Sequence, residues 1–507
     1  MFLFKNAKMF DFLKSHLKIL FVAPEAAPFV KVGGLGEVMF SLPKTLRELG
    51  YDARVFIPKY ATLDAEKFVL KLECDGIRPQ SDDKDPYGLL VSNVLRYENE
   101  DGETTAYFLE NMEYYEKRAN VYGYNDDTVR WVLLSKGVLE FIKKFSWKPD
   151  IIVACDWQAG FVPNLLRVDY KDDPTLNKIK VVFSIHNLRF QGMFDHHFVS
   201  EMDFDAGQAE IPDFFDERIL KLNGMRRGIM YADAINTVSP TYSREILSKE
   251  FGETLDDLLC ERRTALCGIL NGIDIDLWNP ETDGEIPANY SSKNLEKKAE
   301  NKLALQKYFG LTEDKNKFVI GIVSRMDEQK GFNLIVEIMN SLLQNINFQL
   351  AIVGTGDNLY RRFFQDLQKN YPDRVGGHYF FDIKLPRLIL AGSDAVLIPS
   401  RFEPSGLVQM EAMRYGTIPI VRRTGGLADS VEDYLPGQNK GTGFTFEKYD
   451  KHAFLIAIVR ASETYKNGKE WRKLVKMAMA KDFSWKKSAE EYIELFRSVL
   501  KSDGKED

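Results

Sequence analysis

The feature that most constrains the fold is a unit that returns along the chain. Each copy has a short β-branched apolar run, then a polar or glycine-rich loop, then an amphipathic helical pattern. The first copy starts at KILFVAP and continues into a helix with apolar residues three and four apart between Leu35 and Leu49. Further copies start at DIIVACDWQAG, KVVFSIHNLRF and ADAINTVSPTYS. This repetition predicts parallel α/β construction.

A polar stretch after Pro280 interrupts the series, and a second series follows. Its strand starts are FVIGIVSRMDEQKG, FQLAIVGTGDN, DAVLIPSRFEPSG and TIPIVRRTGGLADSV. A chain of 507 residues is also too long for one compact core. We therefore expect two Rossmann-like, doubly wound domains that face a central cleft, residues 18–268 and 269–482. Around them we expect an amphipathic N-terminal arm (1–17), a C-terminal helix packed back on the first domain (483–500) and a polar tail (501–507).

Composition excludes several classes of protein. The net charge is −7 and the basic residues are scattered, which argues against a nucleic-acid partner. No run approaches the roughly 20 apolar residues that a membrane-spanning helix needs. The four cysteines show no metal-ligand spacing, so we expect neither structural zinc nor a disulfide framework, and a cytoplasmic location fits.

The glycine-rich loop KVGGLGEV follows the first predicted strand. Gly33 and Gly34 would let backbone N–H groups at a helix N-terminus approach an anion or a sugar, and Lys31 adds a movable positive charge. The alternative is a tight strand-to-helix turn without a ligand. The loop is not the GxGxxG pattern of dinucleotide-binding enzymes, which weakens a dehydrogenase interpretation.

Two cations, Arg325 and Lys330, lie between a strand and a helix in SRMDEQKG. Two cations that lie close together repel each other unless an anion lies between them. A diphosphate would supply that anion. The alternative is a pair of solvated surface charges.

Strand ends supply the remaining polar candidates. Glu403, in RFEPSGLVQME, could accept hydrogen bonds from sugar hydroxyls. The alternative is a structural carboxylate beside a helix start. We expect Ser405 to cap that helix. Asp156 and His186 follow two strands of the first series and suit a sugar, although a lone histidine there is more often structural.

The acidic pair in NGIDID could suggest a metal site. Asp274 and Asp276 form a DxD pattern at the predicted interdomain linker. Such pairs arise often by chance, so we interpret this one as a turn and predict no catalytic metal.

With these motifs assembled, the chain resembles the bacterial glycogen synthases and plant starch synthases, from about Leu17 to Leu500. The resemblance is carried by KVGGLGEV, SRMDEQKG, FEPSGLVQMEAMRYG, TGGLADSV and NGIDIDLWNP, in the family's order. It implies a GT-B architecture and a retaining glycosyltransferase that needs no cofactor. The chain departs from the family pattern at Val32, Glu37 and Ser405, where threonine, aspartate and cysteine are usual.

The resemblance also implies roles for individual residues. Those expected at the nucleotide sugar are Lys31, Gly33, Gly34 and Glu37 from the first domain, and Arg325, Lys330, Phe381, Gly406 and Leu407 from the second. Arg325 and Lys330 would hold the diphosphate, Phe381 would stack on the base, and Glu403 would hold the glucose hydroxyls. Asp156, His186 and Asn271 match positions near the glucose and the acceptor.

The implied reaction moves glucose from ADP-glucose, with UDP-glucose possible, to the 4-hydroxyl at the non-reducing end of an α-1,4-glucan. Closure of the two domains would exclude water. Other interpretations stay open: a related enzyme with a sucrose-directed or lipid-directed acceptor, or a non-catalytic glucan-binding protein. Residue types leave the oligomeric state open, and a plastid location is not excluded.

Overall fold

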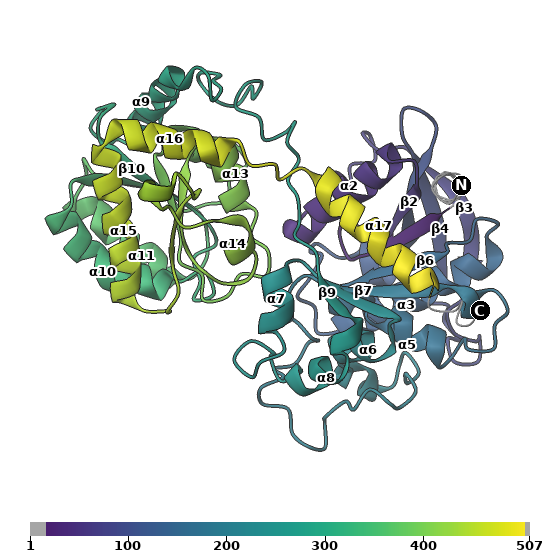
Figure 1. Ribbon diagram of the computed structural model, residues 1–507. Coiled ribbons are helices and arrows are strands. Elements are labelled where there is room, and N and C mark those ends of the chain that lie inside the picture. Colours follow the sequence, from purple (N-terminus) through teal and green to yellow (C-terminus); the bar gives the residue numbers. More distant parts are fainter. Residues whose placement is uncertain (1–16, 502–507) are drawn as a thin grey trace, which may run out of the picture. The chain divides into compact units, whose positions relative to one another are not determined.

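The computed structural model describes residues 17–501, which form two compact units (Figure 1). Unit 1 contains residues up to 238, residues 243–269 and the C-terminal residues from 485; unit 2 contains residues 239–242 and 270–484. The expected N-terminal arm, apart from Leu17, and the polar tail beyond residue 501 lie outside the described residues.

Unit 1 is built on a nine-stranded sheet in the order β3-β4-β5-β2-β1-β6-β7-β8-β9. Pairing is parallel from β5 to β9, whereas β3, β4 and β5 pair antiparallel at one edge. The strands are β1 Lys18–Val22, β2 Asp52–Pro58, β3 Leu70–Ile77, β4 Ser92–Glu98, β5 Thr104–Glu110, β6 Ile151–Cys155, β7 Lys180–Ile185, β8 Ala234–Thr237 and β9 Leu266–Gly268. The repeating α/β unit does not predict the antiparallel edge, because β3 to β5 are joined without crossover helices.

The long helices of unit 1 pack on this sheet. They are α2 Gly34–Glu48, α3 Asp127–Lys144 and the C-terminal α17 Trp485–Lys501. Shorter elements are η1 Met112–Glu116, α4 Asp156–Ala159, α5 Phe161–Arg167, η2 Leu176–Lys178, η3 Glu217–Lys221, α6 Gly224–Tyr231, α8 Asp256–Glu261 and η4 Arg263–Ala265. Helix α7 Pro240–Glu245 is divided between the two units, because its residues 240–242 are assigned to unit 2. On α17, Ala489, Ile493 and Phe496 join the same apolar cluster as Ile19 and Phe21 of β1.

A buried hydrogen bond also attaches α17 to this sheet. The Tyr492 hydroxyl accepts from Asn236 Nδ2 of β8 at 2.9 Å. The C-terminal helix therefore belongs to unit 1, although the chain reaches it only after passing through unit 2.

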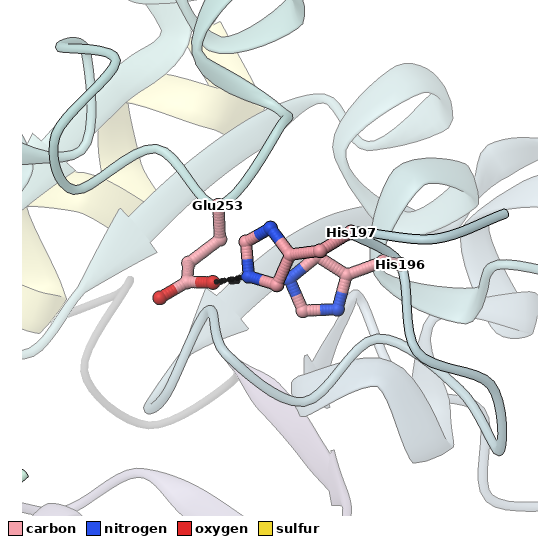
Figure 2. A group of neighbouring side chains, drawn as sticks. All are labelled: His196, His197 and Glu253. Atoms are coloured by element: carbon pink, nitrogen blue, oxygen red, sulfur yellow. Dashed lines mark hydrogen bonds and ion pairs between the residues drawn. The ribbon is translucent and has the colours of Figure 1, made fainter. Parts of the chain in front are cut away.

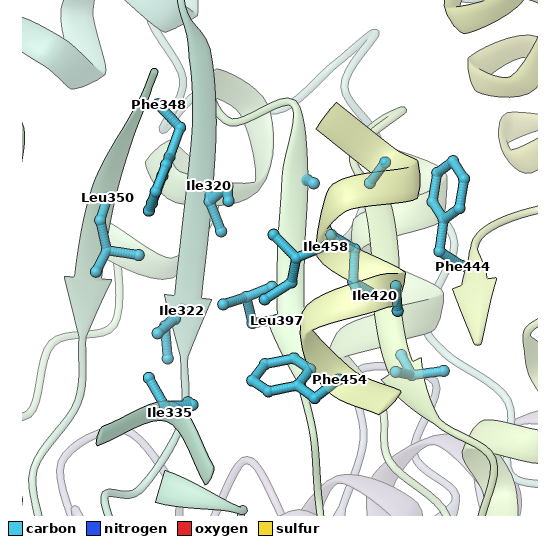
Figure 3. Close-up of a cluster of buried hydrophobic side chains, with 14 of the residues drawn as sticks. Ile320, Ile322, Ile335, Phe348, Leu350, Leu397, Ile420, Phe444, Phe454 and Ile458 are labelled. Carbon is cyan, nitrogen blue, oxygen red and sulfur yellow. The ribbon is translucent and has the colours of Figure 1, made fainter. Parts of the chain in front are cut away.

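Unit 2 has a six-stranded, fully parallel sheet in the order β12-β11-β10-β13-β14-β15. Its strands are β10 Phe318–Val323, β11 Phe348–Val353, β12 Val375–His378, β13 Ala395–Ile398, β14 Ile418–Arg422 and β15 Phe444–Phe446. Its helices are η5 Leu295–Lys297, α9 Lys298–Tyr308, α10 Phe332–Asn345, α11 Asn358–Asn370, α12 Leu385–Gly392, α13 Val408–Arg414, α14 Gly425–Ser430, η6 Pro436–Gln438, α15 Lys451–Lys466 and α16 Gly468–Met479. Figure 3 shows Ile320, Leu397 and Ile420 of neighbouring strands against Phe454 and Ile458 of α15 in the core.

Strand order fixes where a ligand can bind in each unit. The order reverses between β10 and β13 in unit 2, and between β1 and β6 in unit 1. In doubly wound sheets the crevice for a ligand opens beyond the carboxyl ends of the strands at such a reversal. The loops after β1, β6, β10 and β13 are therefore the expected positions of ligand-binding residues.

The prediction of two α/β units built on parallel sheets is confirmed. Among the described residues, no helix is both long enough and apolar enough to cross a membrane.

Candidate active site

The loop after β1 is organised around Glu25, a buried carboxylate that sequence reasoning missed. Its Oε2 accepts a hydrogen bond from the amide of Val32, and from that of Gly33 at 3.1 Å. Burial raises the pKa of Glu25, and the hydrogen bonds from Val32 and Gly33 oppose the rise. A single acid inside the apolar run KILFVAPEAAP was the signal that could have revealed it.

The glycine-rich loop packs tightly over Glu25. A Cβ on Gly36 would lie 3.2 Å from Glu25 Oε2 and 3.3 Å from the Lys31 Cα, so the first turn of α2 has little room for a side chain. Gly33 precedes α2 and Gly34 is its first residue. Lys31 Nζ lies 2.6 Å from Glu37 Oε2, and half of the lysine side chain (51%) is exposed. Lys31 is therefore restrained by Glu37 while still facing solvent.

Asp156 and His186 follow the neighbouring strands β6 and β7. Asp156 Oδ1 accepts from the amides of His186 at 2.7 Å and Asn187 at 3.2 Å. Burial raises the pKa of Asp156 to about 7, against these hydrogen bonds and with help from the negative charge of Glu25. Asp156 also has a φ of 56°, which is uncommon for a residue with a side chain.

His186 is held neutral. Burial lowers its pKa to about 4, so the imidazole is uncharged near pH 7. Its Nε2 lies 3.1 Å from the Ser184 hydroxyl. The end of unit 1 at the β1/β6 reversal thus offers two buried carboxyl groups and a neutral imidazole, and the imidazole can both donate hydrogen bonds to hydroxyl groups and accept them.

In unit 2, Lys330 and Glu403 meet at the β10/β13 reversal. Lys330 Nζ lies 2.6 Å from Glu403 Oε2, and the same oxygen accepts from the Ser400 hydroxyl at 3.0 Å. The Glu403 side chain is only 7% exposed and that of Lys330 21%. Burying the charge of Glu403 costs free energy of desolvation, and the contacts from Lys330 and Ser400 offset that cost.

Gly331 brings the two loops of this ion pair together. It has a φ of 77° and precedes α10, and a Cβ there would lie 2.1 Å from the Pro399 carbonyl oxygen. Arg325, on the same loop, is 60% exposed and its Nη1 lies 3.4 Å from Asp327 Oδ2. Arg325 is therefore the more accessible of the two expected cations.

The segment 403–407 is fixed from a third side by the TGGLADSV motif. The Gly426 amide donates to the Glu403 carbonyl at 3.1 Å. A Cβ on Gly425 would lie 1.9 Å from that same carbonyl oxygen. Gly406 has a φ of 67°, and Gln409 Nε2 donates to its carbonyl at 2.9 Å. Close backbone contacts thus hold the loop that carries Glu403.

The prediction that Ser405 caps the following helix is wrong. That helix, α13, begins at Val408 with Leu407 at its N-cap and no side-chain cap. Ser405 Oγ is buried without a hydrogen-bond partner among the described residues. The left-handed Gly406 intervenes, so the chain turns once more before the helix begins.

Comparison with known proteins decides the family. Residues 18–261 match the model for the starch synthase catalytic domain, and residues 306–478 match that for glycosyl transferases group 1. A glycogen synthase of Clostridium perfringens is 43% identical over 488 residues, which cover 96% of this chain and 99% of the relative. The chain belongs to the glycogen and starch synthase family. It is therefore a glycosyltransferase, and the expected resemblance is confirmed.

Solved structures agree with this family assignment. The catalytic domain of starch synthase IV from Arabidopsis thaliana, solved with ADP and acarbose, has a TM-score of 0.82 and 33% identity; the match covers 96% of this chain and 100% of that one. Sucrose-phosphate synthase from Thermosynechococcus elongatus shares the fold, with a TM-score of 0.59 and 19% identity, over 96% of this chain and 100% of that chain. The GT-B fold predicted for this synthase is confirmed.

The residues expected at the site of this synthase fall into groups. In unit 1, Lys31 and Gly33 lie on the loop over Glu25, and Gly34 and Glu37 lie in the first turn of α2 that follows it. Asp156 contacts the His186 backbone. In unit 2, Lys330 contacts Glu403, while Arg325, Gly406 and Leu407 lie on the same two loops.

Two further expected residues lie outside these clusters. Phe381 follows β12 and is 79% exposed. Asn271 is buried in unit 2, and its Oδ1 has no hydrogen-bond partner among the described residues. The Asp274 carboxylate accepts from the amides of Asp276 and Leu277 at 3.1 and 2.9 Å, which confirms the predicted turn.

Proposed function

We propose that this synthase transfers glucose from ADP-glucose to the 4-hydroxyl at the non-reducing end of an α-1,4-glucan, with retention of the α configuration. The observation that carries the proposal is the Lys330–Glu403 pair at the strand-order reversal of unit 2, beside the exposed Arg325. A cation pair suits a diphosphate, and a carboxylate suits sugar hydroxyls. The relative from Arabidopsis, solved with ADP and acarbose, supports a donor with an adenine base and a glucan-like acceptor.

The donor residues would stabilise the leaving group. As the bond from glucose to the diphosphate breaks, negative charge grows on the diphosphate and positive charge on the sugar. Arg325 and Lys330, with the amides around Gly406 and Leu407, would stabilise the diphosphate, an effect that strengthens where water is excluded. Glu403 would orient the glucose and favour its positive charge. Lys31, paired with Glu37, is the expected cation from unit 1.

The carboxyl groups of unit 1 argue against a covalent intermediate. Retaining hydrolases use a nucleophilic carboxylate about 5–5.5 Å from a second carboxyl group. In this chain both oxygens of Glu25 accept backbone amides, as does Oδ1 of Asp156, so both carboxyl groups contact the backbone rather than forming an evident nucleophile pair. We therefore favour attack on the same face, in which the leaving phosphate takes the acceptor proton. The neutral His186 and Asp156 would hold sugar hydroxyls, and Asn271 and Phe381 would contact the acceptor end and the base, respectively.

One assay tests this proposal. The protein is given radiolabelled ADP-glucose or UDP-glucose with glycogen as primer, in parallel with sucrose-forming and lipid acceptors. We expect label in glycogen, at least about tenfold faster from ADP-glucose, and its release by an exo-acting enzyme that cleaves α-1,4 bonds from non-reducing ends. Label in another acceptor, or faster transfer from UDP-glucose, would contradict the proposal. Since we propose no catalytic metal or cofactor, EDTA should leave the rate unchanged.

A further inference from the structure

Three potential metal ligands converge in unit 1, apart from the residues of the candidate active site (Figure 2). Glu253 Oε2 lies 3.0 Å from His196 Nε2 and 2.9 Å from His197 Nε2. One ligand atom from each side chain falls within 4.8 Å of the other two. The His196 and Glu253 side chains are mostly buried, at 9% and 17% exposed, whereas half of His197 is exposed.

The backbone directs these side chains toward one another. A turn in which the Phe198 amide donates to the Asp195 carbonyl at 3.0 Å lets two adjacent histidines approach the same oxygen. Glu253 comes from a distant part of the sequence, and it and Thr254 have φ values of 48° and 68°. Residues with side chains seldom adopt this left-handed conformation, and such conformations often mark functional positions.

A backbone contact fixes Glu253. Gln191 Nε2 donates to the Glu253 backbone carbonyl at 2.7 Å, which fixes the position from which the side chain extends.

We propose that His196, His197 and Glu253 bind one divalent transition metal ion of the Zn²⁺ type. Ligand atoms about 2.0–2.2 Å from a tetrahedral zinc ion lie roughly 3.3–3.6 Å from each other. Both histidine nitrogens lie about this far from Glu253 Oε2, and all three ligand atoms lie within 4.8 Å of one another, so rotation of the side chains would complete the set. Two imidazoles and one carboxylate are nitrogen and oxygen ligands that zinc prefers, with water in a fourth position. The ion would play no part in the proposed glucose transfer.

The role of this ion would be to connect two loops. The histidines lie in the segment that follows β7, and Glu253 lies before α8. Apolar burial holds this segment weakly, since Phe198 is 85% exposed and Met202 96%. A metal bound by both loops would therefore restrain the first loop more than the hydrogen bonds do.

Calorimetric titration with ZnCl₂ tests the proposal on the full chain, prepared without a tag and freed of metal with EDTA. We expect one zinc ion per chain with a dissociation constant of about 10 μM or below. His196→Asn and His197→Asn should each weaken binding at least about tenfold. His452→Asn is the matched control, because His452 is 74% exposed beside Asp450 in unit 2 and should bind as the unsubstituted chain does.

Two outcomes would overturn the proposal: no binding at about 100 μM zinc, or binding that is unchanged in both histidine variants. His197 is half exposed, so its substitution should leave folding intact, which circular dichroism checks. Co²⁺ in place of zinc gives a second measurement. Its absorption should show nitrogen and oxygen ligands only, and an intense thiolate band would assign the metal to cysteine and contradict the proposal.

Discussion

Glu403 combines a structural contact and the proposed contact to glucose in one side chain. In the present structure its Oε2 is bonded to Lys330 and Ser400. Both contacts hold the carboxylate in place while Lys330 remains near the proposed diphosphate. A charge of this kind contributes to turnover only if it favours the transition state more than the bound substrate.

Replacing Glu403 with glutamine therefore tests its role. Glu403→Gln keeps the shape and removes the charge, so kcat should fall about 100-fold or more. Glu463→Gln is the matched control, since Glu463 is 61% exposed and paired with Lys466 on α15 of the same unit. Its rate should stay within about twofold of the unsubstituted enzyme. Near-normal turnover of Glu403→Gln would rule out the assigned role.

Asp156 should make stability depend on pH. Its pKa is about 7 when folded, above the ordinary value of 3.8 for an aspartate, so the folded state binds more protons than the unfolded state between about pH 4 and 7. The free energy of unfolding must then fall as pH rises through that window. His186 has a folded pKa of about 4, below the ordinary value of 6.5 for a histidine, so its contribution to the free energy of unfolding rises with pH between about pH 4 and 6.5.

Asp156→Asn isolates the first effect. The variant keeps His186 and an oxygen that accepts the two amides. Its free energy of unfolding, measured relative to that of the unsubstituted chain, should therefore increase by about 2–4 kcal/mol as pH rises from 4 to 7.5. Urea unfolding at several pH values measures the difference. Asp172→Asn, at an exposed position of unit 1, is the control and should show a difference that does not change with pH. If the difference in the free energy of unfolding between Asp156→Asn and the unsubstituted chain did not change with pH, the raised pKa would be contradicted.

At the scale of elements, the site depends on glycines that let loops touch. Gly331 brings the loop after β10 to the loop after β13, and Gly425 brings the start of α14 to the Glu403 carbonyl. Neither position tolerates a Cβ, and both have positive φ. The position of Glu403 therefore depends on these two close backbone contacts as well as on where the neighbouring strand ends and the helix begins.

Gly425→Ala tests this dependence. Because the new Cβ would lie 1.9 Å from the Glu403 carbonyl oxygen, the loop must move. We expect a loss of about 2–4 kcal/mol in the free energy of unfolding and a large loss of activity. Gly437→Ala is the control in the same unit, since nothing lies within 4 Å of its added Cβ. If Gly425→Ala unfolds and reacts like Gly437→Ala, the close contact is not required.

The sequence predicts elements better than it predicts contacts between them. The strands at DIIVAC, KVVFSI and FVIGIV appear as β6, β7 and β10, because period and turn signals are local. The antiparallel β3–β5 edge, the role of Glu25 and the failure of Ser405 as a cap depend on pairing, burial and the left-handed turn at Gly406. Likewise, spacing identifies Lys330 and Glu403 but does not show that they form an ion pair.

In the whole molecule, both units share one arrangement: the strand order of the sheet reverses, and charged side chains lie on the loops that follow the strands at that reversal. Unit 2 presents Arg325, Lys330 and Glu403 there, whereas the buried groups of unit 1 are the carboxyl groups of Glu25 and Asp156 and a neutral imidazole, with Lys31 as its exposed cation. We therefore expect unit 2 to bind most of the diphosphate and the Asp156 and His186 region of unit 1 to bind sugar hydroxyls.

Hydrogen exchange should therefore respond differently to the two substrates. ADP should slow amide exchange in residues 324–331 and 400–408 of unit 2. A malto-oligosaccharide should slow exchange mainly in residues 156–160 and 184–188 of unit 1, because hydroxyl groups would bind near Asp156 and His186. Mass spectrometry of peptides from both units measures the effect, and α16, distant in sequence from these loops, gives the reference peptides. Protection by ADP confined to unit 1 would contradict the division.

In the proposed reaction Arg325 and Lys330 hold the diphosphate of the donor. A crystal structure of the full chain with ADP tests it most directly. The account predicts that the Arg325 guanidinium and the Lys330 ammonium lie within hydrogen-bond distance, about 2.7–3.2 Å, of diphosphate oxygens. If ADP is bound while both groups point into solvent away from the phosphates, the account is contradicted.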